Sequence, residues 1–117
     1  MAGGLRFRSE AIKIATTSFP VATTVIVATS LLTGIQRAGI YRLILSGNST
    51  TAATFTFQDT GPNAISAVYN LAANGIFFLD VPINGDPWFQ ATAAALGLQI
   101  VVTGATITGD IYWAAGA

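Results

Sequence analysis

Cysteine and histidine are absent from the 117-residue chain, and only 9 % of its residues are charged. The sequence therefore offers no disulfide, no thiol or imidazole chemistry, and no zinc site of the usual ligand types. Disorder is also excluded, because 52 % of the residues are hydrophobic and disordered chains combine low hydrophobicity with high charge. The composition indicates one folded domain and excludes most enzyme mechanisms.

The few charges that are present balance to a formal net charge of zero. Five basic residues and Glu10 give residues 1–42 a charge of +4, and four aspartates give the remainder −4. Proteins that are close to neutral tend to associate, and a separation of charge can orient a subunit on its partner. We expect a subunit that is permanently packed against neighbours.

A long uncharged run, residues 14–36, could be mistaken for a membrane segment. It contains six threonines, two serines, a proline and a glycine, so it is not the continuous apolar stretch that spans a bilayer. The basic start and cleavage pattern of a secretory signal are also missing. We expect a soluble protein with no membrane contact.

Alternation of apolar and polar residues predicts β-strands in four segments, residues 40–46, 51–58, 98–103 and 105–113. In the first of these, Tyr41, Leu43 and Leu45 are expected to share one face. Further strands are predicted at residues 21–30, 65–71 and 76–82, and a short helix is possible at residues 88–95. Turn clusters such as Ser46-Gly47-Asn48 separate these segments. The pattern predicts an all-β antiparallel sandwich of about seven or eight strands.

The N-terminus differs from the rest of the chain. Its first 13 residues, MAGGLRFRSEAIK, hold four of the ten charged residues and no sustained alternation. We predict an N-terminal arm, residues 1–18, that lies on a neighbouring subunit, followed by a β-sandwich domain, residues 19–117. Arg6, Arg8 and Lys13, with Phe7 as the one interleaved aromatic residue, form too small a basic patch to indicate nucleic-acid binding.

Asp59-Thr60-Gly61 follows an apolar strand, which is the local pattern of dimeric aspartic proteases, in which two carboxylates share a proton. Pro62 and Asn63 depart from that pattern, and no later apolar–apolar–Gly loop gives convincing support for such a site. Asp-Thr-Gly-Pro-Asn is also typical of a turn. We predict a turn and no enzyme activity, with a protease as the enzymatic alternative.

Asp80, Asn84 and Asp86 are candidate metal ligands, because their side-chain oxygen atoms suit calcium. The spacing of a calcium-binding loop is missing, and Asn84-Gly85 is a strong hairpin signal. We therefore predict no metal and no cofactor.

The same segment has the residue types of a carbohydrate contact, because Asn84, Asp86 and Trp88 combine short polar groups with an aromatic ring. Alternatively, Trp88 buries its ring at the end of the core, as a tryptophan after a turn commonly does. Both interpretations remain open at the level of sequence.

Between residues 40 and 113 the chain runs as an apolar strand, a Thr-rich strand ending in Asp-x-Gly, a central aromatic strand, Trp-Phe after a turn, and a closing pair of strands. The corresponding pieces are YRLILSG, TFTFQDTG, NGIFFLDVP, PWFQ, ALGLQIVVTG and ATITGDIYW. Over about two thirds of the chain, this order resembles small jelly-roll virion proteins of tailed bacteriophages, the capsid decoration (cement) class.

The resemblance implies a jelly-roll-like sandwich that binds the outer surface of the major capsid protein shell as a homotrimer and stabilises it by non-covalent contacts. It carries no catalytic residues. The arm residues Arg6, Phe7, Arg8 and Lys13 are our candidates for capsid contacts, with arginine pairing to carboxylates. The alternative is a glycan- or receptor-binding module of a phage fibre or tail.

Overall fold

The computed structural model describes residues 11–82 and 85–116. Strands dominate this part of the chain, which confirms the predicted all-β class. The elements follow in the order β1 (Ile12–Lys13), β2 (Ser18–Phe19), β3 (Thr23–Val27), the 3-10 helix η1 (Thr29–Leu31), β4 (Arg37–Ser46), β5 (Ala53–Asp59), β6 (Tyr69–Leu71), β7 (Ile76–Leu79), β8 (Phe89–Gln90), β9 (Leu98–Thr103) and β10 (Ile107–Gly116).

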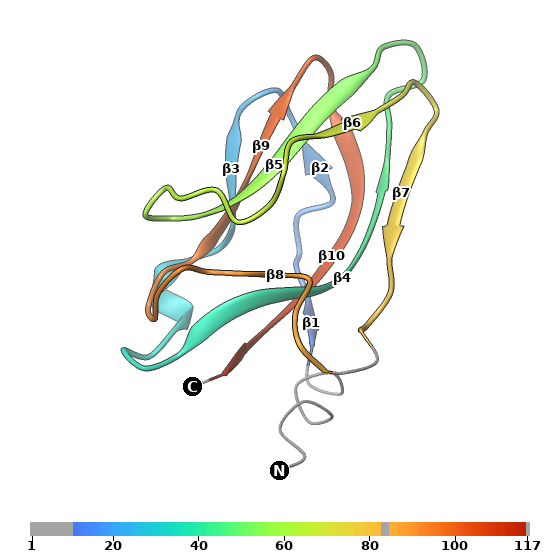
Figure 1. The fold of residues 1–117 in the computed structure, drawn as a ribbon. Helices are drawn as coiled ribbons and strands as arrows, with labels where there is room; N and C mark the ends of the chain where they lie inside the picture. The colour runs from blue at the N-terminus through green and yellow to red at the C-terminus, as the bar shows by residue number, and fades with distance from the viewer. Residues whose placement is uncertain (1–10, 83–84, 117) are drawn as a thin grey trace.

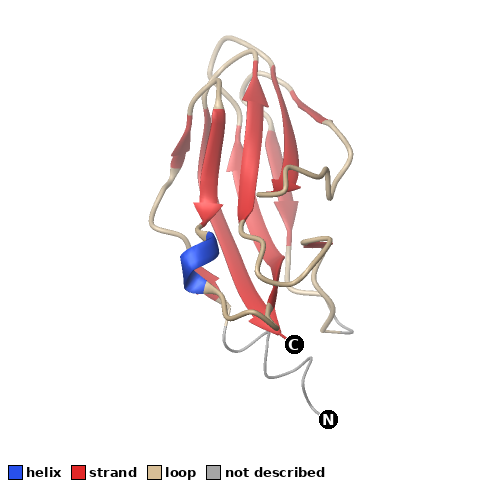
Figure 2. Cartoon of the chain, turned by 90° about the vertical axis from the view of Figure 1, so that its left-hand side faces the viewer, coloured by secondary structure: helices blue, strands red, loops and turns tan. Residues whose placement is uncertain are grey.

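Two antiparallel sheets pack face to face (Figures 1 and 2). One has the order β1-β10-β4-β7, with β2 also on β10 and β8 also on β4, and the other has the order β3-β9-β5-β6. Because β1 and β2 share one partner, and β7 and β8 share another, the elements form eight strand positions. The first position pairs with the eighth, the second with the seventh, the third with the sixth and the fourth with the fifth, which is the pairing of a jelly roll.

The core lies between the two sheets, and aromatic rings join them. The Phe55 ring of β5 lies 5.1 Å from that of Phe77 on β7, and the Phe57 ring lies 5.3 Å from that of Phe89 on β8. Such pairs add about 0.5–1.5 kcal/mol to the burial of their area. In β5 and β9 every second residue is buried, as the alternation predicts: Ala53, Phe55, Phe57, Leu98, Ile100 and Val102.

The alternation in β4 is interrupted by a β-bulge. Arg42 pairs with Tyr112 and Ile40 with Trp113, so Tyr41 has no partner of its own on β10. Ile40 therefore joins Leu43 in the core cluster, whereas Tyr41 is buried outside that cluster. The prediction that Tyr41 shares a face with Leu43 and Leu45 was wrong, because strict alternation cannot anticipate an extra residue.

The helix considered for residues 88–95 is absent. The amides of Trp88 and Ala91 donate hydrogen bonds to the carbonyls of Ile40 and Ala38, at 2.8 and 2.9 Å, which holds this segment along β4 as β8. Ala95 then takes a positive φ of 63°, which is incompatible with a continuing right-handed helix. Pairing with a neighbouring strand has overridden the helix propensity of the alanines.

Three predicted strands are shorter in the structure than in the sequence analysis. The segment 21–30 forms β3 and then η1, the segment 65–71 is a strand only from Tyr69, and the segment 76–82 ends as a strand at Leu79. The shortening lies at strand ends, where alternation carries the least information.

The predicted arm overlaps the sandwich. β1 pairs Ile12 with Trp113 and Lys13 with Tyr112, Ile14 belongs to the buried core, and β2 pairs Ser18 with Thr108. The sandwich therefore includes residues that the sequence analysis assigned to the arm. An arm can only consist of the residues before Ile12.

Candidate interaction surfaces

Asp59, the candidate protease residue, is a fully buried carboxylate with five hydrogen bonds. One oxygen accepts from the amides of Gly61 and Asn63, both at 2.9 Å, and from Nδ2 of Asn63 at 3.0 Å. The other accepts from the amide of Thr92 at 2.9 Å and from its hydroxyl at 2.5 Å. The carboxylate closes its own turn and joins it to the segment after β8.

The same contacts determine the ionisation of Asp59. Burial alone raises the pKa of a carboxyl group, but the hydrogen bonds from Thr92, Asn63 and Gly61 together hold the pKa of Asp59 well below its ordinary value. An aspartic protease needs an accessible carboxylate that exchanges a proton near its working pH. Asp59 is inaccessible and its pKa lies well below the ordinary value, so its geometry is that of a structural clamp.

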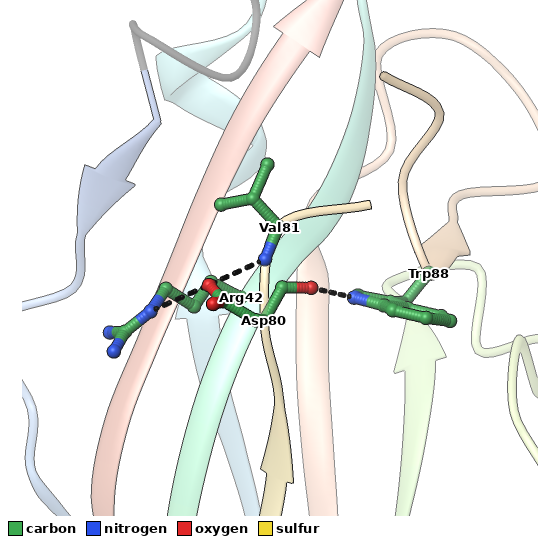
Figure 3. A network of polar contacts seen from close by, with 4 residues as sticks. All are labelled: Arg42, Asp80, Val81 and Trp88. Atoms are coloured by element: carbon green, nitrogen blue, oxygen red, sulfur yellow. Dashed lines mark hydrogen bonds and ion pairs between the residues drawn. The ribbon is translucent and has the colours of Figure 1, made fainter. Parts of the chain in front are cut away.

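The segment that leads to Trp88 forms a second candidate surface (Figure 3). Nε1 of Trp88 donates to the carbonyl of Asp80 at 2.5 Å, and the Asp80 carboxylate accepts from the amide of Val81 and lies 3.3 Å from Nε of Arg42. The Trp88 side chain is 44 % exposed. Trp88 therefore does not close the core, and its ring is available at the surface.

Asp86 lies at the base of the same segment. Burial raises the pKa of the Tyr41 phenol, and the negative charge of Asp86 raises that pKa further. Pro87 packs on β4, where a Cβ atom at Gly39 would lie 2.6 Å from Cβ of Pro87. Asn84 lies outside the described residues. Of the predicted carbohydrate contacts, the structure brings Asp86 and Trp88 to one side of β4.

The outer face of the six-stranded sheet is polar and aromatic. The Arg42 guanidinium lies 5.5 Å from the centre of the Phe78 ring and 5.1 Å from that of Tyr112, within the range of cation–π contacts. Nζ of Lys13 lies 3.4 Å from a carboxylate oxygen of Asp110. Lys13 is thus a partly exposed residue of a paired strand. Arg6, Phe7 and Arg8, the other candidate capsid contacts, lie outside the described residues.

The outer face of the four-stranded sheet has a different character, because its strands carry no charged side chain other than the buried Asp59. Its edge strand β3 has no lysine or other charge that would discourage pairing with another chain. The outward-facing residues are threonine, glutamine, asparagine and valine: Thr23, Val25, Thr54, Thr56, Gln58, Asn70, Gln99, Val101 and Thr103.

An open apolar groove, here called the base groove, lies between β1 and β3, the neighbouring edges of the two sheets. It has a volume of about 600 Å³, and a smaller groove of about 240 Å³ continues it along the end of β10. Ile12, Val25 and Leu31 line the base groove and are 55 %, 53 % and 61 % exposed, while Trp113 is buried at its side. Contiguous exposure of large apolar side chains is typical of surfaces that bind other molecules.

The sequence analysis did not find the base groove. Its lining comes from residues 12–16, from residues 25–31 and from Trp113, which are brought together only by the pairing of β1 with β10 and of β3 with β9. The one signal of the groove in the sequence is the uncharged run of residues 14–36, which contributes most of the lining. Taken alone, that run suggests a membrane segment.

Neither a metal site nor a membrane helix is found within residues 11–82 and 85–116. No three acidic side chains there are grouped as a metal site would require. The helical content of this region is the short η1, and no helix reaches the length and hydropathy needed to cross a bilayer.

No protein-family model and no curated protein matches the chain. Among solved structures it is similar to the infectious bursal disease virus Gx strain (12 % identity, TM-score 0.30), to the Gt strain of that virus (14 %, 0.27) and to its VP2 subviral particle (13 %, 0.26). Each alignment covers 90 % of this chain but at most 31 % of the other.

The fold therefore defines the class of the protein as an antiparallel β-sandwich with jelly-roll strand pairing. Its surface offers an apolar groove and a largely uncharged sheet face instead of a catalytic constellation among the described residues.

Proposed function

We propose that the chain is a structural virion protein, a capsid decoration (cement) subunit of a bacteriophage, which binds the outer surface of the major capsid shell as a homotrimer. The observation that carries the proposal is the base groove, with Ile12, Val25 and Leu31 exposed at the point where the chain leaves the sandwich toward its N-terminus. The resemblance of its strand and turn pattern to small virion proteins supports the same function.

The mechanism is adhesion through buried surface. Each Å² of apolar surface removed from water contributes ~25 cal/mol, and a stable contact between proteins buries about 1,600 Å² in total. Repeated at every lattice point, such contacts resist expansion of the shell. The basic N-terminal segment, with Arg6 and Arg8, supplies charge-assisted pairing with capsid carboxylates.

The structure also suggests how a deletion must be designed. Removal of residues 1–13 would also remove Ile12 and Lys13, both paired with β10. A loss of binding could then come either from the missing arm or from the missing strand. Removal of residues 1–10 leaves β1 in place and is the appropriate variant.

The proposal is tested by co-sedimentation with shells assembled from the major capsid protein of the same virus. The full chain is expected to bind saturably, and the variant without residues 1–10 is expected to lose at least tenfold in affinity while keeping the far-UV spectrum of the full chain. Decoration at full occupancy by the truncated variant would contradict the role of the arm, and failure of the full chain to bind would contradict the proposed function.

A receptor-binding module of a fibre or tail is the second candidate, and the exposed Trp88 ring, two residues after Asp86 in the sequence, favours it. A glycan array with the full chain tests it. Saturable binding to a defined sugar that is lost in Trp88→Ala, but retained in the control Ile76→Ala on the edge strand β7, would support this function over decoration. Absence of binding to any sugar would remove it.

A further inference from the structure

We propose that the base groove of one copy holds the N-terminal segment of a second copy, with Leu5 and Phe7 as the inserted side chains. The inference deepens the proposed function, because it takes the chain to be a subunit of a homo-oligomer and names what connects the copies. Four features lead to it: the groove, the edge of β10 beside it, the pattern of residues 1–10, and the direction in which the chain leaves β1.

The groove requires an apolar occupant. Ile12 and Leu31 stand 55 % and 61 % exposed at its rim, and Val25 is 53 % exposed on the opposite edge strand. The continuing small groove is lined by Ala114 and Ala115, whose short side chains leave room beside Trp113. A volume of about 600 Å³ accommodates one or two large apolar side chains and is too small for a folded domain.

Next to the groove, the edge of β10 beyond Trp113 is unpaired within the described residues. β10 pairs with β4 as far as Gly116, but with β1 only as far as Trp113. Within the described residues, the edge of β10 from Ala114 to Gly116 therefore has no strand on the side of β1. Backbone groups on such an edge bind an extended peptide by strand addition, while its alternate side chains enter the neighbouring pockets.

The N-terminal segment has the matching pattern. Leu5 and Phe7 alternate with Arg6 and Arg8, so an extended conformation would direct the two apolar side chains to one face and the two basic side chains to the other. With the apolar face in the groove, Arg6 and Arg8 would lie on the solvent side of the contact between the two copies. They remain available there for the carboxylates of a shell.

The direction of the chain favours a second copy over the same copy. Residues 12–16 line the groove themselves, so the segment before them would have to reverse between Arg8 and Ala11 to enter its own groove. The stretch from Leu5 to Ala11 contains no glycine, proline, asparagine or aspartate, and Ser9 is its one residue of a type common in turns. Ten extended residues reach about 33 Å, comparable with the 28 Å second dimension of the molecule.

Two copies that exchange segments reciprocally form a two-fold dimer. Where each copy instead gives its segment to the next copy in one direction, the contact is heterologous. Such contacts form a closed ring when the rotation between copies closes, and an open fibre when it does not. A homotrimer is a ring of this kind with three copies. Closure of the ring gives an assembly of small, neutral subunits a defined number of copies.

Disulfide trapping tests the inference cleanly, because the chain has no native cysteine. Phe7→Cys and Leu31→Cys are prepared separately, mixed and oxidised. A cross-linked dimer that contains one of each variant is expected, and the control mixture of Phe7→Cys with Ile76→Cys is expected to give none, since Ile76 is equally exposed but lies on β7. A double variant that forms only an internal disulfide would overturn the proposal.

The oligomeric state of the free protein gives a second readout. We expect Phe7→Asp and Leu31→Asp each to weaken self-association at least tenfold in sedimentation equilibrium, and Ile76→Asp to leave it unchanged. If the wild-type chain is monomeric at all concentrations, the proposed insertion of one copy's N-terminal segment into another copy's base groove is wrong, even if the chain decorates shells normally. A chain that is cross-linked as expected but does not bind shells would instead contradict the proposed function.

Discussion

Asp59 shows how a residue that suggests catalysis in the sequence becomes a structural one in the fold. Its motif, Asp-Thr-Gly, could belong to a protease or to a turn, and the sequence favoured the turn because Pro62 and Asn63 follow. The structure adds Thr92, 33 residues away, whose amide and hydroxyl bind the second carboxylate oxygen. Local chemistry predicted the turn, but not the distant partner that makes Asp59 a link between two parts of the molecule.

Replacement of this carboxylate is therefore expected to destabilise the fold. In Asp59→Asn one oxygen becomes an amide that donates hydrogen bonds, so donors of Thr92 or of Gly61 and Asn63 lose their acceptor in a buried site. We expect a loss of about 2–4 kcal/mol in the free energy of unfolding, measured by urea titration. The control Asp110→Asn breaks only the exposed contact with Lys13 and is expected to cost less than about 1 kcal/mol. Equal losses in the two variants would contradict the clamp.

Asp59 also predicts a dependence of stability on pH. Its pKa in the folded state lies below the ordinary value of 3.8, so the unfolded state takes up the proton first as the pH falls. The stabilisation is complete above the ordinary pKa and is lost progressively below it. The free energy of unfolding of the wild type is expected to fall more steeply below about pH 4 than that of Asp59→Asn, measured by urea titration at several pH values. Parallel curves for the two proteins would show that Asp59 does not carry this dependence.

At the scale of strands, the sequence predicted the interiors and missed the irregular positions. Period-two alternation placed the inward residues of β5, β9 and β10 correctly, because burial of one face is a strong and local constraint. The bulge at Tyr41 and the pairing of β8 with β4 depend on a neighbouring strand that is remote in the sequence. These are tertiary effects, and they explain why Tyr41 and residues 88–95 were wrongly predicted.

At Gly109 the backbone of β4 lies close against β10. Its φ is +150°, and a Cβ atom there would lie 2.0 Å from the carbonyl oxygen of Ile44. We expect Gly109→Ala to lower the free energy of unfolding by about 2 kcal/mol or more, because both the backbone conformation and the contact resist a side chain. Gly34→Ala is the matched control, since nothing lies within 4 Å of the added atom, and it is expected to be neutral or slightly stabilising. Thermal unfolding of both variants would show the difference.

At the scale of the whole molecule, composition anticipated the character of the surface but not its location. The scarcity of charge predicted a subunit that packs against partner subunits, and the structure shows where its apolar side chains are exposed. The base groove combines Ile12, Leu31 and Trp113, which are separated by up to about a hundred residues. Only the pairing of the first and last strands brings them together, so the groove could not be predicted without the topology.

The two contacts proposed for the N-terminal segment differ in their physical basis, and salt should separate them. Insertion of Leu5 and Phe7 into the base groove depends on apolar burial, which added salt does not screen. Attachment of Arg6 and Arg8 to a shell depends on charge, whose range shrinks from about 10 Å at 0.1 M salt to about 3 Å at 1 M. Between these salt concentrations we expect the self-association constant, measured by sedimentation equilibrium, to stay within about twofold. Shell binding, measured by co-sedimentation, is expected to weaken at least tenfold.

In a double variant, Arg6→Gln with Arg8→Gln, shell binding should be weak at both concentrations while the oligomer persists. An oligomer that dissociates in 1 M salt would mean that charge, and not the apolar groove, holds the copies together.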